Sequence, residues 1–176
     1  MRIIAGTLKG RRLKAPEGTF FVRPTADRAR EALFSILQKW ERGPFLDLYA
    51  GTGAVGLEAF SRGYAPVTCV EKDLEVLDYL RANLKGAEVK VVPEDVRQLG
   101  AKSFQGLAVV FADPPYEGGA EAWALLSGKL AGWLAPGGVV VFETRAGLAL
   151  DPAKGLEPLE VRRYGAAEFH IFGRSG

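Results

Sequence analysis

The sequence is poor in the residues that build disulfides and metal sites. Its 176 residues include one cysteine, Cys69, and one histidine, His170. A single cysteine excludes an internal disulfide, and these two residues cannot form a cysteine cluster or a multi-histidine metal centre. We therefore expect no bound metal. Cys69 stands within an apolar stretch and is predicted to be a small core residue, and His170 is predicted to be structural rather than catalytic.

Long apolar runs are also missing. No segment approaches the roughly 18 consecutive apolar residues that a membrane helix needs, so no membrane partner is expected. The N-terminus holds no apolar stretch followed by a cleavage site, which predicts that there is no export signal and that the protein is cytoplasmic. With 48% hydrophobic and 25% charged residues, the composition is typical of globular proteins. The length predicts one domain over residues 1–176, and we expect a monomer.

The net charge of +2 conceals an uneven distribution. Residues 1–42 contain ten Lys or Arg and four Asp or Glu, whereas the rest of the chain contains 13 and 17. A basic arm on a mildly acidic body indicates that the arm meets a polyanionic partner. The alternative is a basic hairpin that is simply solvated.

Strands and helices alternate along most of the chain. Two short strands over residues 2–5 and 11–15 predict a hairpin, and Thr25 is expected to cap a helix that Gly43-Pro44 ends. Further strands are expected over residues 45–50, 67–71, 89–92, 107–111 and 139–143, with helices over 57–61, 73–85 and 120–134 between them, and residues 157–164 and 167–173 look like an antiparallel pair. The pattern predicts an α/β fold with a doubly wound, mostly parallel, seven-stranded sheet and an antiparallel hairpin at its C-terminal edge. Residues 1–24 form a basic hairpin extension of a core over 25–176.

A glycine-rich loop follows the first strand of that core. The segment Gly51–Gly56 fits the pattern G-x-G-x-x-G and opens a helix, and Glu71 ends the next strand 20 residues after Gly51. Glycines there let the backbone approach a ligand, and a carboxylate at the position of Glu71 can accept hydrogen bonds from both ribose hydroxyls. Together they predict an adenosine cofactor. A tight strand–helix turn beside a surface glutamate is the alternative.

Three further residues could bind parts of a cofactor, and the groups that they could bind indicate which cofactor it is. Asp47 stands inside an apolar strand, where a carboxylate is costly without a partner, and it could receive the ammonium group of S-adenosylmethionine. A structural bond from Asp47 to the loop amides is the alternative. Asp95 could accept from the adenine amino group while the Val96 N–H donates to the ring. Equally, Asp95 could cap a short helix over residues 96–99.

The segment Asp113–Tyr116 forms the stiffest corner of the chain. It follows the apolar run 107–111, which is typical of a strand buried on both faces, and two prolines end that strand. Ligands of open α/β sheets bind beyond the carboxyl ends of the strands. The Asp113 carboxylate and the Pro114 carbonyl could hold an exocyclic amino group in line with a methyl donor, and Tyr116 could stack on the base.

These motifs resemble those of the class I amino-methyltransferases, which share a Rossmann-like fold. The resemblance is carried by Asp47–Ala59, DLYAGTGAVGLEA, and by Asp113–Tyr116, DPPY. Within this class, the chain resembles the bacterial 16S rRNA guanine-N2 methyltransferases. This closer resemblance is carried by the segments Arg2–Gly6, Gly10-Arg11 and Arg23–Phe34. The resemblance implies that the protein uses S-adenosylmethionine to methylate the N2 amino group of one guanosine in 16S rRNA, within the 30S subunit or its assembly intermediate.

The candidate residues fall into three groups. The catalytic candidates are Asp113, Pro114 and Tyr116; the cofactor-binding candidates are Asp47, Tyr49, Gly51, Thr52, Gly53, Glu71, Lys72, Asp95 and Val96; the RNA-binding candidates are Arg2, Lys9, Arg11, Arg12, Lys14, Arg23 and Arg28. Arg28 and Arg30 could instead pair with acidic neighbours along their helix. An adenine-N6 DNA methyltransferase, a nicotinamide dehydrogenase and a non-catalytic RNA-binding assembly factor are the competing functions.

Overall fold

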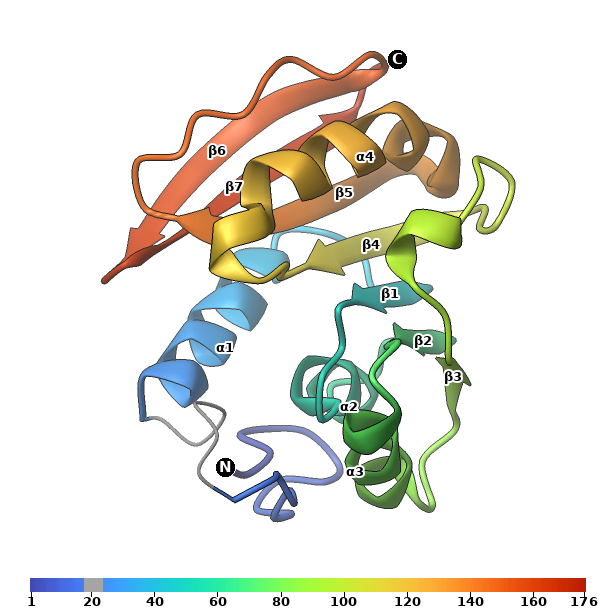
Figure 1. Ribbon diagram of the computed structural model, residues 1–176, viewed down its shortest axis with the longest axis vertical. Coiled ribbons are helices and arrows are strands. Elements are labelled where there is room, and N and C mark those ends of the chain that lie inside the picture. Colours follow the sequence, from blue (N-terminus) through green and yellow to red (C-terminus); the bar gives the residue numbers. More distant parts are fainter. Residues whose placement is uncertain (18–23) are drawn as a thin grey trace.

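A seven-stranded sheet organises the molecule (Figure 1). The computed structural model describes residues 1–17 and 24–176, although not the side chains of residues 24–26 and Tyr116, so the predicted RNA-binding residue Arg23 lies outside the described residues. The strands are β1 (Phe45–Leu48), β2 (Val67–Val70), β3 (Val89–Val92), β4 (Leu107–Ala112), β5 (Leu134–Arg145), β6 (Leu156–Tyr164) and β7 (Ala167–Arg174). Their order is β3-β2-β1-β4-β5-β7-β6. Strands β1 to β5 pair in parallel, and β7 is antiparallel to both β5 and β6, as predicted.

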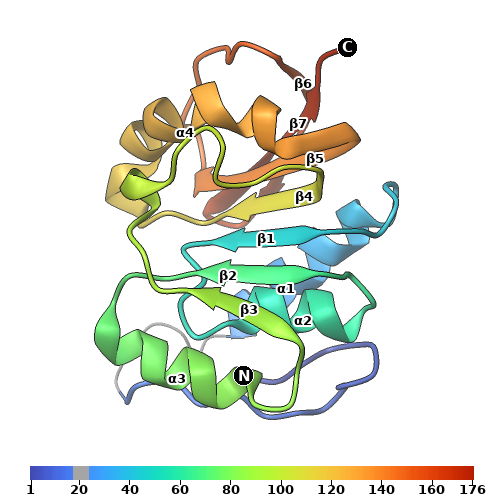
Figure 2. The ribbon, with the colours of Figure 1, turned by 90° about the vertical axis from the view of Figure 1, so that its right-hand side faces the viewer.

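Helices cover both faces of the sheet (Figure 2). They are α1 (Pro24–Leu37), α2 (Ala54–Ser61), α3 (Leu74–Leu84) and α4 (Gly119–Trp133), with short 3₁₀ turns η1 (Val96–Gln98) and η2 (Tyr116–Gly118). Strand β4 shows the two-sided burial, because Val110 packs in the core on the α4 side while Phe111 packs in the core on the α1 side. Since apolar residues fill both faces of β4, its first polar residue, Asp113, stands just beyond its carboxyl end.

Several element boundaries differ from the prediction by a few residues. Helix α1 begins at Pro24, which suits the first helical position, so Thr25 lies inside the first turn rather than at the cap. The predicted first strand of the core ends at Leu48 and not at residue 50, because the chain turns into the left-handed region at Tyr49, with φ 60°. Residues 2–5 and 11–15 form one antiparallel bridge, Arg2 with Arg12, rather than two strands.

The N-terminal arm, residues 1–14, packs against α2 and α3 (Figures 1 and 2). The fully buried carboxylate of Glu58 accepts hydrogen bonds from the Ile4 and Ala5 N–H groups at 2.8 and 3.0 Å. The Ile3 side chain is buried with leucines of both helices. At the far end of the arm, Asn83 exchanges hydrogen bonds with the backbone of Lys14. The arm backbone is therefore docked on the core, in contrast to a fully solvated hairpin.

The helices of the described residues include none that is both long and apolar enough to cross a lipid bilayer.

Candidate active site

Acidic side chains gather where the parallel strands end. Leu48 of β1 and Phe142 of β5 both pair with Ala112 of β4, so Asp113, the next residue of the chain, lies between the ends of β1 and β5. Asp47 is in register with Phe111, which shares a face of the sheet with Asp113. Glu143 follows Phe142 and occupies the position beside Asp113. The site therefore forms at the switch point of the sheet, where the strand order reverses between β1 and β4.

The corner after β4 offers two acceptors without donors. Neither the Asp113 carboxylate nor the Pro114 carbonyl accepts a hydrogen bond from any described residue. Pro114 is buried, and Pro115 precedes η2, where the Gly118 N–H donates to the Pro115 carbonyl at 2.8 Å. This bond and the two fixed proline rings hold the corner rigid. Tyr116 starts η2, but its side chain lies outside the described part of the structure.

The glycine loop uses each of its glycines differently. Gly51 and Gly53 have φ of 55° and 85°, values that favour glycine, and a Cβ on Gly53 would lie 2.5 Å from Leu80 Cδ1. Gly56 lets α2 approach β2, because a Cβ there would lie 2.3 Å from Cys69 Sγ. The buried Thr52 is fixed through its carbonyl, which accepts from Asn83 at 2.9 Å. The loop is thus a tight turn between β1 and α2 in which Gly53 and Gly56 pack closely against neighbouring side chains.

Glu71 joins the loop to β2. Its Oε2 accepts from the Gly51 N–H at 2.8 Å, and its Oε1 accepts from the N–H groups of Lys72 and Asp73 at 2.8 and 2.9 Å. A carboxylate has about four acceptor positions. One position therefore remains on Oε2, so this arrangement suits one ribose hydroxyl directly, and a second hydroxyl would have to share an acceptor with a backbone N–H.

Asp95 has the capping role that was one of its two predicted roles. Its side chain accepts from the Arg97 N–H at 2.9 Å at the start of η1, and it also binds the Arg97 guanidinium and, at 3.2 Å, Lys72 Nζ. The Arg97 hydrogen bond is the main reason why the pKa of Asp95 lies far below its usual value. Val96 begins η1, so its N–H has no acceptor within that turn. Burial, and then the charge of Asp95, raise the pKa of Tyr49.

Asp47 is buried and makes one structural bond. It is 1% exposed, and its Oδ2 accepts from the Gly56 N–H at 2.9 Å, so the predicted alternative of a bond to a loop amide is confirmed. Burial raises the pKa of Asp47 to about 8, the Gly56 bond opposes this shift, and the charges of Asp113 and Glu71 add to it. An uncompensated buried carboxyl of this kind would favour a positively charged ligand group.

Glu143 is a site residue that the sequence analysis missed. Burial first, and then the charge of Asp113, raise its pKa. Desolvation by the surrounding protein also raises the pKa of Asp113, whose side chain remains in contact with water. One sequence signal could have identified Glu143. Like Asp113, it directly follows an apolar strand run, Val139–Phe142.

The predicted RNA-binding residues fall into two groups. The first group is exposed to solvent and consists of Arg2, Lys9, Arg12, Lys14 and Arg28. Arg11 is half-buried, and its guanidinium donates to the Asn83 and Lys85 carbonyls at 2.7 and 2.8 Å, at the C-terminus of α3. Arg30 is buried and pairs with Asp27 at 3.1 Å, as the alternative reading predicted, whereas Arg28 makes no ion pair with a described residue.

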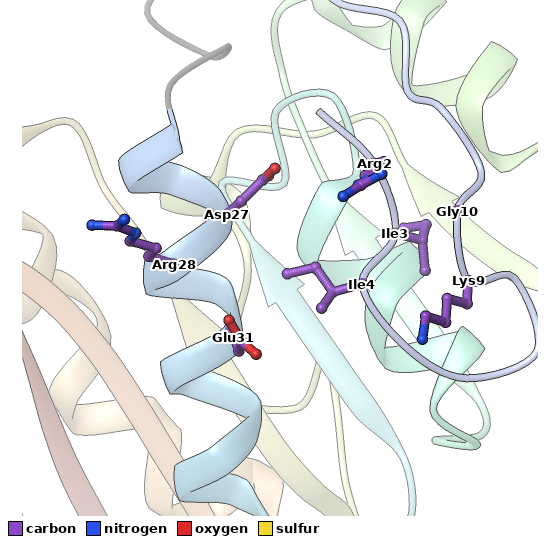
Figure 3. A pocket seen from close by; sticks show the side chains of 8 residues that line it. All are labelled: Arg2, Ile3, Ile4, Lys9, Gly10, Asp27, Arg28 and Glu31. Atoms are coloured by element: carbon purple, nitrogen blue, oxygen red, sulfur yellow. The ribbon is translucent and has the colours of Figure 1, made fainter.

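A pocket of about 440 Å³ lies between the arm and α1 (Figure 3). Three of the exposed cations, Arg2, Lys9 and Arg28, line it together with Ile3, Ile4, Gly10, Asp27 and Glu31. Figure 3 shows Asp27 directed from α1 toward Arg2 of the arm. None of the lining residues belongs to a strand end, so this pocket is distinct from the acidic site at the edge of the sheet.

The other polar candidates do not join the site. His170 is buried, with Nε2 3.0 Å from Thr144 Oγ1, and Cys69 is buried in the core as predicted. Within residues 1–17 and 24–176, no three His, Cys, Asp or Glu side chains are grouped so that they could hold a metal ion.

Comparisons with known proteins show the family and the fold of this chain. The family model described as Conserved hypothetical protein 95 matches residues 1–173. Ribosomal RNA small subunit methyltransferase D from Escherichia coli (strain K12) is 37% identical over 161 residues, which cover 87% of this chain and 80% of the relative. The solved structure of the Escherichia coli protein yhhF is similar with a TM-score of 0.78 and 31% identity, over 99% of this chain and 97% of that chain.

The fold extends to more distant proteins. A TehB-like SAM-dependent methyltransferase from Corynebacterium glutamicum shares it with a TM-score of 0.63 at 17% identity, over 85% of this chain and 96% of that chain. The predicted Rossmann-like class I methyltransferase fold is confirmed, and the methyltransferase relatives support S-adenosylmethionine as the cofactor. The chain therefore belongs to the family described as Conserved hypothetical protein 95 and, within it, is a relative of the ribosomal RNA small subunit methyltransferases D.

Proposed function

We propose that this protein methylates the N2 amino group of one guanosine in the 16S rRNA of the small ribosomal subunit. The observation that carries the proposal is the pair of unpartnered acceptors, the Asp113 carboxylate and the Pro114 carbonyl, beside the glycine loop. The name of the Escherichia coli relative supports ribosomal RNA as the substrate. The resemblance of the motifs to the guanine-N2 methyltransferases favours guanine N2 over other amino groups as the methylated group.

The residues of the site suit S-adenosylmethionine. When bound, the cofactor would supply an electrophilic methyl group on a positively charged sulfonium. Glu71 keeps one acceptor position for a ribose hydroxyl, and the free Oδ1 of Asp47 can receive the ammonium group of the methionine moiety. Among the described residues, Asp47 has no cationic partner that would compete for it.

Asp113 and Pro114 would act by positioning. The lone pair of an exocyclic amino group is delocalised into the base, so the amine is a poor nucleophile. Two acceptors that bind its two hydrogens turn the lone pair toward the methyl group. Positioning of this kind can lower a barrier by roughly 7–11 kcal/mol. Methylation makes the amine acidic, and the Asp113 carboxylate, with a pKa raised toward neutrality, can take the released proton.

The arm and the pocket beside α1 would hold the RNA backbone. Arg2, Lys9 and Arg28 line that pocket, and Arg12 and Lys14 are exposed on the arm. Contacts from such cations to phosphates make binding strongly salt-dependent. A guanine methylated on N2 has to be reached in a loop or flipped out of its stack, which leaves its edge free for the acidic site. We further propose a cytoplasmic monomer without a bound metal, in which residues 1–24 extend a core over 25–176.

Transfer of a tritiated methyl group tests the proposal. Unmodified small subunits, free rRNA and duplex DNA are compared as substrates, and the labelled nucleotide is then mapped. We expect label on N2 of one guanosine in the 16S rRNA. Label on adenine of the DNA, or no label on any substrate, would refute the proposed function.

The Asp113→Ala variant tests the acceptor pair. Because Asp113 holds the amine and not the cofactor, we expect the variant to lose turnover while its affinity for S-adenosylmethionine, measured by calorimetry, stays within a few-fold. A variant that still methylates at the wild-type rate would remove the assigned role of Asp113.

A further inference from the structure

Glu143 is a nearly buried carboxyl group without a partner. It is 9% exposed, and its side chain makes no hydrogen bond or ion pair with any described residue. Among the described residues, Arg30 Nε is the one side-chain nitrogen or oxygen that is both fully enclosed and without a hydrogen-bond partner, so the unpartnered carboxyl oxygens of Glu143 are not fully enclosed. They therefore reach solvent through an opening. Burying an unpaired carboxyl costs free energy, so a position like this is hard to explain by stability alone.

The register of the sheet shows where that opening lies. Phe111 and Val141 are paired on β4 and β5 and point into the same core cluster, on the α1 side. Asp113 and Glu143 each stand two residues further along, so their side chains point to that same side. Neighbouring strands lie about 4.8 Å apart, which places the two carboxyl groups side by side. The charge of Asp113 acts on Glu143, in agreement with this placement.

The strand order separates Glu143 from the cofactor residues. Along the edge of the sheet, Asp95 follows β3, Glu71 follows β2, the glycine loop follows β1, Asp113 follows β4 and Glu143 lies on β5. Asp113 thus stands between the cofactor residues and Glu143. If Asp113 holds the amine that receives the methyl group, Glu143 lies on the side of the base, away from the cofactor.

We propose that Glu143 accepts a hydrogen bond from the N1–H of the target guanine and so distinguishes guanine from purines whose N1 carries no hydrogen. The proposal rests on the proposed function. On the guanine edge, N1–H and the N2 amino group are adjacent donors, and they match two adjacent carboxyl acceptors. A purine with an unprotonated N1 presents a lone pair there, and a site built to hydrogen-bond one edge rejects an analogue that leaves its buried polar group unpaired.

The experiment uses small subunits reconstituted with a synthetic rRNA segment that carries either guanine or 2-aminopurine at the methylated position. The 2-aminopurine base keeps the 2-amino group but has an acceptor at N1. We compare the ratio of kcat/KM for the two substrates in the wild type, Glu143→Gln and Glu143→Ala. The Glu157→Gln variant is the matched control, because Glu157 is exposed on the edge strand β6.

We expect the wild type to prefer guanine strongly. The amide of Glu143→Gln can accept from guanine N1–H or donate to 2-aminopurine N1, so the preference for guanine should fall by about tenfold or more. Glu143→Ala should lower it as well, by losing activity on guanine. Thermal unfolding should show that Glu143→Gln is at least as stable as the wild type, and Glu157→Gln should leave the preference unchanged.

The outcomes separate the two proposals. If the wild type methylates guanine but accepts 2-aminopurine equally well, or if both Glu143 variants keep the wild-type preference, the role of Glu143 is wrong while the proposed function stands. If the wild type methylates neither base, the proposed function fails, and the role of Glu143 fails with it.

Discussion

Glu58 holds the arm on the core, and Glu58→Gln should release it. The Glu58 carboxylate is fully buried between the Ile4 and Ala5 N–H groups, Arg62 Nε at 2.8 Å and Arg30 Nε at 3.4 Å. An amide is neutral and has one acceptor oxygen. The substitution therefore leaves at least one arm N–H without an acceptor and leaves the buried Arg30 with Asp27 as its only acidic partner.

The expected loss of stability can be worked out from these contacts. Removing one partner of a buried ion pair costs about 3–5 kcal/mol, and a buried donor left unsatisfied costs about 1–3 kcal/mol. These contributions overlap because one carboxylate accepts three hydrogen bonds and also pairs with the Arg30 guanidinium, so we expect a total of about 3–5 kcal/mol. Since domains are stable by only about 5–15 kcal/mol, this is a large fraction. Glu75→Gln, on the exposed surface of α3, should change stability by less than about 0.5 kcal/mol.

The assay combines urea unfolding with limited proteolysis. If Glu58 anchors the arm, Glu58→Gln should unfold at lower urea and be cut within residues 1–14 under conditions in which the Glu75→Gln control is not. Affinity for S-adenosylmethionine should change little, because the contacts of Glu58 lie in the arm, α1 and α2. A loss below about 1 kcal/mol together with a protected arm would refute the assignment.

Three other perturbations have defined outcomes. Asp47→Asn should stabilise the protein increasingly as the pH rises from 3.8, the ordinary pKa, to about 8, the raised pKa, because in this range the wild-type carboxyl is ionised in the unfolded chain and has to take up a proton on folding. The gap should grow by up to about 1.4 kcal/mol per pH unit, as measured by urea unfolding, and a gap independent of pH would contradict this. Replacing Arg12 and Lys14 by alanine should lower RNA affinity and reduce the salt slope by about two without changing the melting temperature. Arg11→Ala, which removes the bonds to the end of α3, should instead lower the melting temperature.

The fold was predictable because its signals are local. Apolar runs without polar residues indicate strands buried on both faces, and the residue after such a run has to lie at an edge of the sheet. That reasoning placed Asp113 correctly just after β4 and would have singled out Glu143 beside it, although β5 continues past Glu143 to Arg145. Asp95 shows where the reasoning reaches its limit. A carboxylate before a short helix suits both a cap and a ligand, and the structure shows the cap.

The role of Glu58 was not predictable from the sequence. It lies in the segment that resembles other methyltransferases, yet its partners Ile4 and Ala5 are 54 and 53 residues away in the chain. No periodicity links residues so distant. The same holds for Arg11, which looks like a free phosphate-binding cation in the sequence but caps the end of α3 in the structure. Charge alone could not divide the basic residues into those that hold the arm and those that remain exposed.

The buried carboxyl groups of the candidate site lie apart from the cations to which we assign RNA binding. Burial raises the pKa of Asp47 and of Glu143, and neither residue has a cationic partner among the described residues. The cost of keeping Asp47 buried falls when a ligand brings positive charge, as the sulfonium and ammonium groups of S-adenosylmethionine do. The exposed cations to which we assign RNA binding lie instead on the arm and beside α1, where RNA phosphates would not compete for the acidic site. Loss of the sulfonium charge on methyl transfer removes part of that compensation, so the site should hold the cofactor more tightly than the neutral thioether product.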